Sequence, residues 1–230
     1  MNSEARSDIL ARVRHGSRGQ TRNEAIRQLG ALGPGPSARL PDEDLAIAFM
    51  ANVLSNQGSV DIAVDRREAV RSIGAYLYQR FRARKLVAGD DPRLAAMPWR
   101  DGGLLPRFGE CQDGEDACLS YARAAAAETG SVIVTTGRGN PAGNNLLAED
   151  HLVLVDYEDL VPTLHEALER VDMTGERPRG VNIISGPSST ADIAKILVRG
   201  AHGPRNWHVI LCGEKVSADQ LERARALVGL

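Results

Sequence analysis

The segment SGPSSTAD, residues 185–192, holds the side chains of this sequence that are best suited to binding an anion. Apolar residues before it predict a buried strand over 181–184, and the apolar spacing after it predicts a helix from residue 188 to Gly200. A helix N-terminus presents free backbone N–H groups to an anion, and hydroxyl side chains add donors. The candidate ligand-binding residues here are Ser185, Gly186, Ser188, Ser189, Thr190 and Asp192.

The same residues also have a purely structural interpretation. Serine, threonine and aspartate are preferred N-caps of helices, and each is worth about 1 kcal/mol in that role. Three consecutive hydroxyl residues exceed what one cap needs, so a ligand site and a plain cap remain alternatives. The GxxxxGK[ST] pattern of nucleotide-binding P-loops is absent from the sequence.

A second candidate loop consists of Gly137, Arg138, Gly139 and Asn140, directly after a predicted strand over 131–135. The glycines would allow close approach of a ligand, and the arginine could bind an anion with two parallel hydrogen bonds. A plain turn is the alternative, and the GxGxxG dinucleotide pattern is missing. If both preceding strands run parallel, this loop and Ser185–Thr190 lie on one rim of the sheet.

Glu128 and two histidines are the remaining candidates for chemistry. Glu128 falls in the last turn of an alanine-rich helix predicted over 116–129, where a carboxylate opposes the helix dipole. It is therefore a candidate general base or nucleophile, with a surface residue as the alternative. His202, in a glycine-rich turn, is a candidate ligand-binding or structural residue, and His151 is expected at the rim. No metal site or Ser-His-Asp triad can be argued from the spacing.

Composition and cysteine spacing restrict the class of protein. The chain has 230 residues, 43% of them hydrophobic, and a net charge of −2, which is ordinary for a globular protein without a strong field toward nucleic acid or membrane. Cys111, Cys118 and Cys212 match no zinc or iron–sulfur spacing, so reduced thiols and no metal or other cofactor are expected. No apolar run is long enough to span a membrane, and no signal peptide is recognisable, so we predict a cytoplasmic location.

Two regions differ in composition. Residues 1–40 form a predicted helical arm with seven arginines and three acidic residues. A nucleic-acid-binding arm is one interpretation, but the arm has no interleaved aromatic residues, so a solvated arm or a docking segment is favoured. Residues 41–230 are expected to form a single domain.

Helices and strands alternate along most of that domain. The predicted helices cover residues 42–55, 65–84, 116–129, 162–171, 188–199 and 217–228, and the predicted strands cover 60–64, 85–88, 131–135, 151–155, 181–184 and 207–211. Such alternation is typical of an α/β fold, here a mostly parallel open sheet with helices on both faces.

Four sequence blocks resemble the LUD domain family, to which lactate utilisation protein C belongs. They are AETGSVIV (127–134), GRGNP (137–141), SGPSSTADI (185–193) and GAHGP (200–204), the last followed by the strand WHVIL. The resemblance covers roughly residues 110–212 well. Ala194 departs from it, since the family pattern leads us to expect a glutamate there.

The resemblance implies a fold related to the NagB/RpiA/CoA transferase-like group, which includes ribose-5-phosphate isomerase. It also implies a role in oxidising L-lactate to pyruvate beside iron–sulfur partner proteins, with no redox centre in this chain. The alternative is a small-molecule enzyme of the isomerase or acyl/CoA-transferase type that binds an anionic substrate at the rim, with Glu128 as base or nucleophile. The residues do not decide whether the chain is an enzyme.

Overall fold

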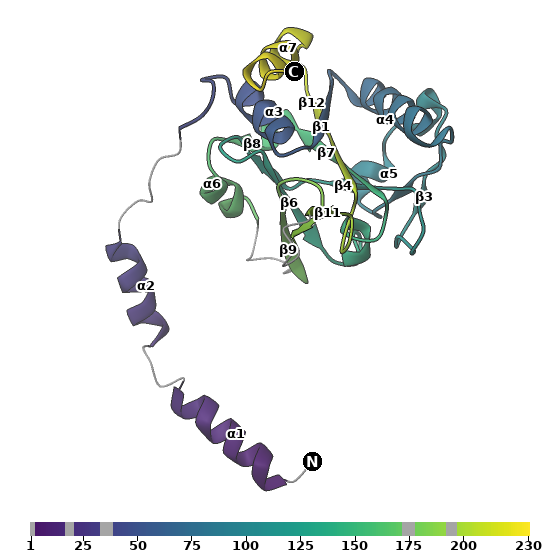
Figure 1. Ribbon diagram of the computed structural model, residues 1–230. Coiled ribbons are helices and arrows are strands. Elements are labelled where there is room, and N and C mark those ends of the chain that lie inside the picture. Colours follow the sequence, from purple (N-terminus) through teal and green to yellow (C-terminus); the bar gives the residue numbers. More distant parts are fainter. Residues whose placement is uncertain (1–2, 17–20, 33–38, 172–177, 192–196) are drawn as a thin grey trace. The chain divides into compact units, whose positions relative to one another are not determined.

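The computed structural model describes residues 3–16, 21–32, 39–171, 178–191 and 197–230. The chain divides into two compact units, Met1–Ala38 and Arg39–Leu230. The first holds α1 (Ser3–Gly16) and α2 (Arg22–Ala31) (Figure 1). At the start of α2, Glu24 Oε2 accepts a hydrogen bond from Thr21 N at 2.7 Å, and Glu24 N donates to Thr21 Oγ1 at 3.3 Å. These two bonds form a capping box, for which Thr21 and Glu24 have the required three-residue spacing.

A six-stranded sheet, all of whose strands run parallel, organises the second unit. The prediction of a mostly parallel α/β fold is therefore confirmed. The strand order is β1 (Ser59–Ala63), β12 (Asn206–Cys212), β7 (Asp150–Asp156), β4 (Ala117–Tyr121), β2 (Val87–Ala88) and β3 (Arg107–Phe108).

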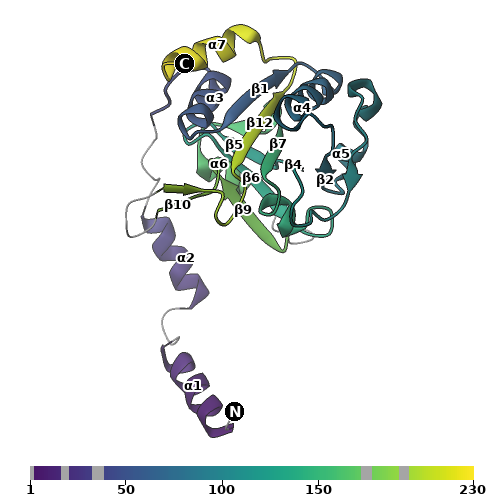
Figure 2. The same ribbon diagram turned by 45° about the vertical axis from the view of Figure 1, so that its right-hand side comes forward.

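Helices cover both faces of this sheet, because alternate residues of its strands face opposite sides. Val153 and Val155 of β7 pack with α3 (Leu45–Ser55) and α7 (Ala218–Leu227). Leu152 and Leu154 pack on the other face with α4 (Arg66–Phe81) and α5 (Pro92–Ala95). The two layers of helices flank β1 and β12 in Figure 2.

The helices begin where the sequence places cap residues. Asp65 Oδ1 accepts from Glu68 N at 2.8 Å at the start of α4. Ser217 and Gln220 form a capping box at the start of α7, which corresponds to the helix predicted over 217–228. No helix among those described is both long enough and apolar enough to cross a membrane.

The alanine-rich segment that predicted a helix over 116–129 instead forms β4 and the short strand β5 (Ala124–Ala126). Four alanines of this segment are fully buried, and successive ones face opposite sides. Ala125 and Ala127 face α3, whereas Ala124 and Ala126 face α6 (Leu164–Glu169). Burial on both faces of a layer therefore overrides the high helix propensity of alanine.

A smaller sheet has the order β8 (Leu160–Val161), β5, β6 (Ser131–Thr136) and β9 (Gly180–Ile184). β6 confirms the strand predicted over 131–135. β9 was predicted as a buried strand, but it lies at the edge of this sheet and is partly exposed along its whole length. β6 runs antiparallel to both β5 and β9.

The helix predicted from residue 188 is also wrong. β10 (Ser189–Ala191) and β11 (Leu197–Arg199) pair antiparallel, with Ser189 opposite Arg199. The segment therefore folds back on itself as a two-stranded ribbon, and there is no helix N-terminus at Ser188. Asp192 and Ala194 lie outside the described residues.

Candidate functional site

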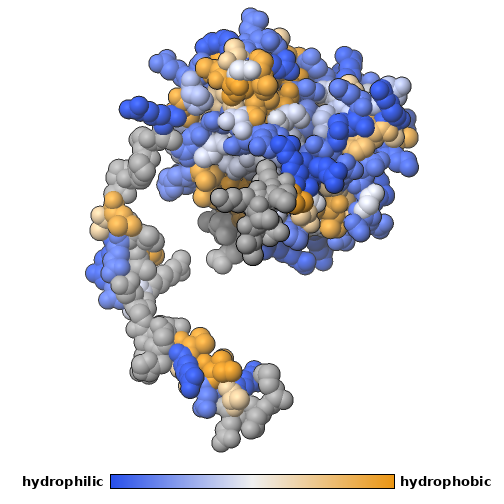
Figure 3. Space-filling view, viewed as in Figure 1, coloured by the Kyte–Doolittle hydropathy of each residue, from blue (hydrophilic) through white to orange (hydrophobic). Residues whose placement is uncertain are grey.

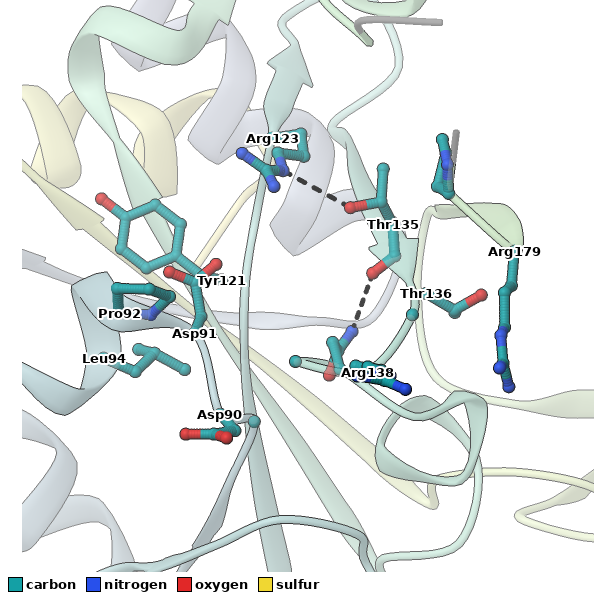
Figure 4. A pocket seen from close by; sticks show the side chains of 15 residues that line it. Asp90, Asp91, Pro92, Leu94, Tyr121, Arg123, Thr135, Thr136, Arg138 and Arg179 are labelled. Atoms are coloured by element: carbon teal, nitrogen blue, oxygen red, sulfur yellow. Dashed lines mark hydrogen bonds between the residues drawn. The ribbon is translucent and has the colours of Figure 1, made fainter. Parts of the chain in front are cut away.

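A cavity of about 480 Å³ lies where β2, β4 and β6 end. Its wall includes Gly89–Pro92 after β2, Arg123 after β4 and the loop Gly137–Asn140 after β6 (Figure 4). The volume falls in the range of small-molecule sites. The carboxyl ends of parallel strands are where ligands bind in open α/β sheets, so β2 and β4 place the cavity where the fold favours a site.

Three arginines give this cavity its charge. Arg123, Arg138 and Arg179 come from three different segments and are labelled among the lining side chains in Figure 4. Within the part of the chain that the structure describes, none of them forms an ion pair. The backbone fixes two of them, since Arg123 N donates to Ile133 O at 2.8 Å and Arg179 N donates to Thr136 O at 2.8 Å.

The acidic side of the cavity is largely neutralised. Arg93 binds Asp91 through Nε at 3.0 Å and Nη2 at 2.9 Å, and its guanidinium stacks 3.6 Å from the centre of the Tyr121 ring. Burial alone would raise the pKa of Asp91, but the hydrogen bonds and charge of Arg93 lower it. Asp90 is therefore the acidic group left to oppose the three arginines among the residues lining the cavity.

Two glycines allow the loops after β2 and β6 to cross. A Cβ on Gly89 would lie 2.8 Å from Gly139 O, and a Cβ on Gly139 would lie 2.9 Å from Asp90 O. Asn140 joins the crossing to β6, because its Nδ2 donates to Thr135 O at 3.2 Å. The second glycine of the GxG pattern is thus required by the contact between the loops.

A buried polar network lies behind Asn140. Ser120 Oγ is 2.9 Å from Asn145 Oδ1, 3.4 Å from Asn140 Oδ1 and 3.0 Å from His151 Nε2. Complete burial lowers the pKa of His151 to about 4, so its ring is neutral at physiological pH. His151 was expected at the rim of the sheet, but it is an interior residue that holds Ser120.

The structure separates the two loops that the sequence placed on one rim. In the β6–β9 pair, Thr136 lies opposite Gly180 and Val132 lies opposite Ile184. Because the two strands are antiparallel, the loop after β9 emerges at the far end of β6 from Gly137. Ser185, Gly186 and Ser189 line a shallow depression there with Asn56 and Gln57 instead.

Further contacts give these residues structural roles. Ser185 Oγ is 2.6 Å from Ser131 Oγ, and Ser188 N donates to Pro204 O at 2.9 Å. Gly186 has a φ of +148°, and a Cβ there would lie 2.7 Å from Asn56 O. Thr190 lies opposite Val198 in the ribbon, and His202 is exposed in the turn after it.

Glu128 also differs from its expected place. It lies in the turn between β5 and β6, at the end of β6 opposite Gly137. Its Oε1 accepts a hydrogen bond from Leu164 N at 2.6 Å, at the start of α6. The carboxylate therefore stabilises a helix N-terminus and does not face the arginine-lined cavity.

Four residues that line the cavity, Asp90, Asp91, Arg123 and Arg179, were not predicted from the sequence. One signal was present, because Gly89-Asp90-Asp91-Pro92 directly follows a predicted strand and so belongs to the carboxyl edge of the sheet. Arg179 had no comparable signal, since its position depends on the antiparallel pairing of β9 with β6.

The described residues do not gather three or more His, Cys, Asp or Glu side chains that could hold a metal ion. Cys111, Cys118 and Cys212 are buried and unbridged. Burial raises the pKa of the Cys212 thiol, which favours its protonated, unreactive form.

This chain is similar in sequence to a known domain and to several known proteins. Residues 112–212 match the model of the LUD domain. Lactate utilization protein C of Exiguobacterium sp. is 30% identical over 140 residues, which cover 56% of this chain and 61% of that protein. Lactate utilization protein C of Halalkalibacterium halodurans is 27% identical over 173 residues, covering 67% of this chain and 75% of that protein. This chain thus spans between three fifths and three quarters of these two relatives.

Two further matches extend the comparison. An uncharacterized protein of Escherichia coli, YkgG, is 40% identical over 88 residues, which cover 36% of this chain and 38% of that protein. The crystal structure of a DUF162 family protein from Deinococcus radiodurans matches with a TM-score of 0.50 and 20% identity. It covers 74% of this chain and 96% of that one, and it shows that the two share a fold.

Proposed function

The chain is a LUD-family protein similar to lactate utilization protein C, and from that premise we propose that it takes part in the oxidation of L-lactate to pyruvate. It acts in the cytoplasm beside iron–sulfur oxidoreductase subunits that carry the electrons. Its own contribution is to bind an anionic ligand of that system in the cavity lined by Arg123, Arg138 and Arg179.

The observation that carries the anion site is the imbalance of charge at this cavity. Three arginines without ion-pair partners in the described chain face one free aspartate, Asp90. A carboxylate would be held by charge-assisted, bidentate hydrogen bonds, which arginine makes better than lysine. The contact between the loops at Gly139 supports Arg138, its neighbour in the chain.

A division of labour with separate redox subunits is supported by the chain's own side chains. Its cysteines are buried thiols without a cluster-binding spacing. The isomerase or transferase alternative has less support, because Glu128 would have to be its base or nucleophile and that carboxylate caps α6.

Growth of a deletion strain tests the role in lactate use. We expect a strain lacking this chain to grow poorly on L-lactate and normally on pyruvate. The wild-type gene should restore growth on lactate, and an Arg138→Ala/Arg179→Ala double variant should not. Normal growth of the deletion strain on lactate would contradict the proposed function.

Direct measurements test the partner and the ligand separately. Affinity purification of the tagged chain from lactate-grown cells should recover iron–sulfur oxidoreductase subunits. Isothermal titration should detect pyruvate or L-lactate binding that is weakened about tenfold or more by Arg138→Ala, as for loss of a charge-assisted hydrogen bond. The absence of iron–sulfur proteins from the purified complex would remove the partner assignment.

A further inference from the structure

Cys111 and Cys118 lie together in a small buried cluster, and neither of them lines the arginine-lined cavity. Cys111 is 1% exposed and Cys118 is 0% exposed. Both are free thiols, so the cluster holds two sulfur atoms that can be oxidised. Cys212, the third cysteine, belongs to a different cluster, which packs against α4 on the large sheet.

The two cysteines differ in how the fold holds them. Cys118 lies in β4, inside the large sheet between β2 and β7. Cys111 lies in the segment between β3 and β4, where it is the buried residue of the otherwise exposed or half-exposed range 105–116. Gly109 and Gly114 flank it with φ of +127° and +82°, and a Cβ on either would meet nothing within 4 Å. Surface loops of this kind open locally at small cost, which brings Cys111 to solvent while the strands stay paired.

Hydrogen bonds keep Cys111 turned inward in the resting loop. Cys111 N donates to Asn144 Oδ1 at 2.7 Å. Arg107 Nη2 binds both carboxylate oxygens of Glu115, at 2.6 and 2.7 Å, and these two residues stand on either side of Cys111 in the chain. The loop is therefore closed over the cluster that contains Cys118.

The contact between the two sulfurs makes one of them the better nucleophile. A hydrogen bond from the Cys118 thiol lowers the pKa of Cys111, and the charge of Arg107 acts in the same direction, against burial and Glu115. The same hydrogen bond, together with burial, raises the pKa of Cys118. As a thiol, Cys111 instead donates to Gln112 O over a long 3.6 Å. Because the thiolate is the reactive form of cysteine, Cys111 reacts first and Cys118 keeps its proton until then.

We propose that Cys111 and Cys118 form a reversible disulfide when the protein meets a peroxide. The Cys111 thiolate attacks one oxygen of hydrogen peroxide, so an S–O bond forms, the O–O bond breaks, and the departing hydroxide takes up a proton to give water. Cys118 then attacks the sulfur of the Cys111 sulfenic acid, so the S–S bond forms and the S–O bond breaks. The Cys118 proton leaves with that hydroxide as a second water. The two thiols are oxidised together, and the peroxide is reduced to water.

Alkylation of the remaining thiols tests this directly, with Cys212 as the internal control. The folded full-length chain is treated with hydrogen peroxide and then unfolded, and its free thiols are alkylated with N-ethylmaleimide. Mass spectrometry should show the loss of two of the three alkylation sites and a peptide in which Cys111 and Cys118 are joined. Cys212 should remain alkylated, because burial raises its pKa. Dithiothreitol before alkylation should restore all three sites.

Three single variants assign the roles of the cysteines. Cys118→Ser should abolish the joined peptide and leave a sulfenic acid on Cys111 that dimedone traps. Cys111→Ser should leave Cys118 fully alkylated after the same treatment, because the reactive thiolate is missing. Cys212→Ser is the matched control and should form the disulfide at the wild-type rate.

The wild-type chain alone can overturn the proposal, whether or not the variants fold. It is overturned if Cys111 and Cys118 both stay alkylated at a peroxide concentration that oxidises glutathione, if Cys212 reacts before them, or if the products are separate sulfinic acids. None of these results bears on growth of the deletion strain on lactate, which tests the proposed function independently.

Discussion

His151 shows how a single buried side chain makes stability depend on pH. Its pKa falls from 6.5 to about 4 on folding because burial disfavours the charged ring, so the unfolded chain binds more protons between these values. Stability is therefore fully present above pH 6.5 and declines as the pH falls toward 4. From pH 7 to pH 5 the loss is on the order of 2 kcal/mol for this residue.

Urea unfolding at the two pH values measures this effect. His151→Gln should reduce the difference between pH 7 and pH 5 by about that amount, because glutamine does not titrate. His165→Gln is the matched control, since His165 is exposed and pairs with Glu169 on the surface. An unchanged pH dependence in His151→Gln would mean that His151 is protonated without cost in the folded chain.

Glu128 is a second residue whose role the structure reassigns. We expect Glu128→Ala to destabilise the protein by about 1 kcal/mol, because Leu164 N at the start of α6 loses its acceptor. Glu128→Gln keeps an acceptor oxygen and should support growth on lactate like the wild type. Loss of growth in Glu128→Gln, with stability retained, would restore Glu128 as a catalytic carboxylate.

At the scale of elements, the crossing of the loops after β2 and β6 controls the arginine-lined cavity. Gly139→Ala would place a Cβ 2.9 Å from Asp90 O, so the loops must separate. We expect a loss of about 1–3 kcal/mol in the free energy of unfolding, together with weaker anion binding. Gly137→Ala meets nothing within 4 Å and is the control.

Thermal unfolding and titration of an anion with the two variants separate these effects. Gly137→Ala should resemble the wild type in both. Equal behaviour of the two alanine variants would show that the loops do not need to touch.

The elements that were predicted correctly are those whose signals lie within a few neighbouring residues of the chain. Asp65 with Glu68, and Ser217 with Gln220, are caps that the chain forms wherever the helix packs. The β-branched and apolar run Ser131–Thr135 is a strand for the same kind of reason. Parallel order followed from the alternation of these elements along most of the domain.

The failures occur where tertiary pairing decides. Ala124–Ala126 consists of the best helix formers, yet it lies in a strand because both of its faces are covered. Gly130, which directly follows the helix predicted over 116–129, adopts φ +63° in a tight turn, where a Cβ would lie 2.6 Å from Val53 N. Asn52 of α3 and Asn56, which directly follows α3, donate side-chain hydrogen bonds to the carbonyls of that turn, a long-range contact that no local pattern encodes.

The difference between local and long-range signals also explains why one predicted loop lines the cavity and the other does not. Gly137–Asn140 needed only the position of β6, which local sequence supplied. Its supposed partner, Ser185–Thr190, depended on the direction of β9, and the antiparallel pairing sends that loop to the other end. Arg179 enters the cavity by that same pairing.

At the scale of the whole molecule, the helices of residues 3–32 leave large apolar side chains exposed, whereas the sheet unit buries most of its own. Ile9, Leu10, Val13 and Ile26 are exposed on α1 and α2, as the apolar areas on these helices in Figure 3 show. Every residue of the four hydrophobic clusters comes from residue 40 onward. The stability of the sheet unit therefore depends on the later part of the chain.

Removing residues 1–38 should accordingly leave the urea midpoint of the remaining chain unchanged, while helical circular dichroism falls by the contribution of α1 and α2. Removing residues 218–230 instead is the contrasting change, because Leu221 and Ala224 of α7 belong to the main core and their loss opens it. Each buried apolar side chain contributes on the order of 1.5–3 kcal/mol, so that truncation should lower the midpoint strongly or prevent folding. A lower midpoint after removal of residues 1–38 would mean that the arm packs against the sheet unit in solution.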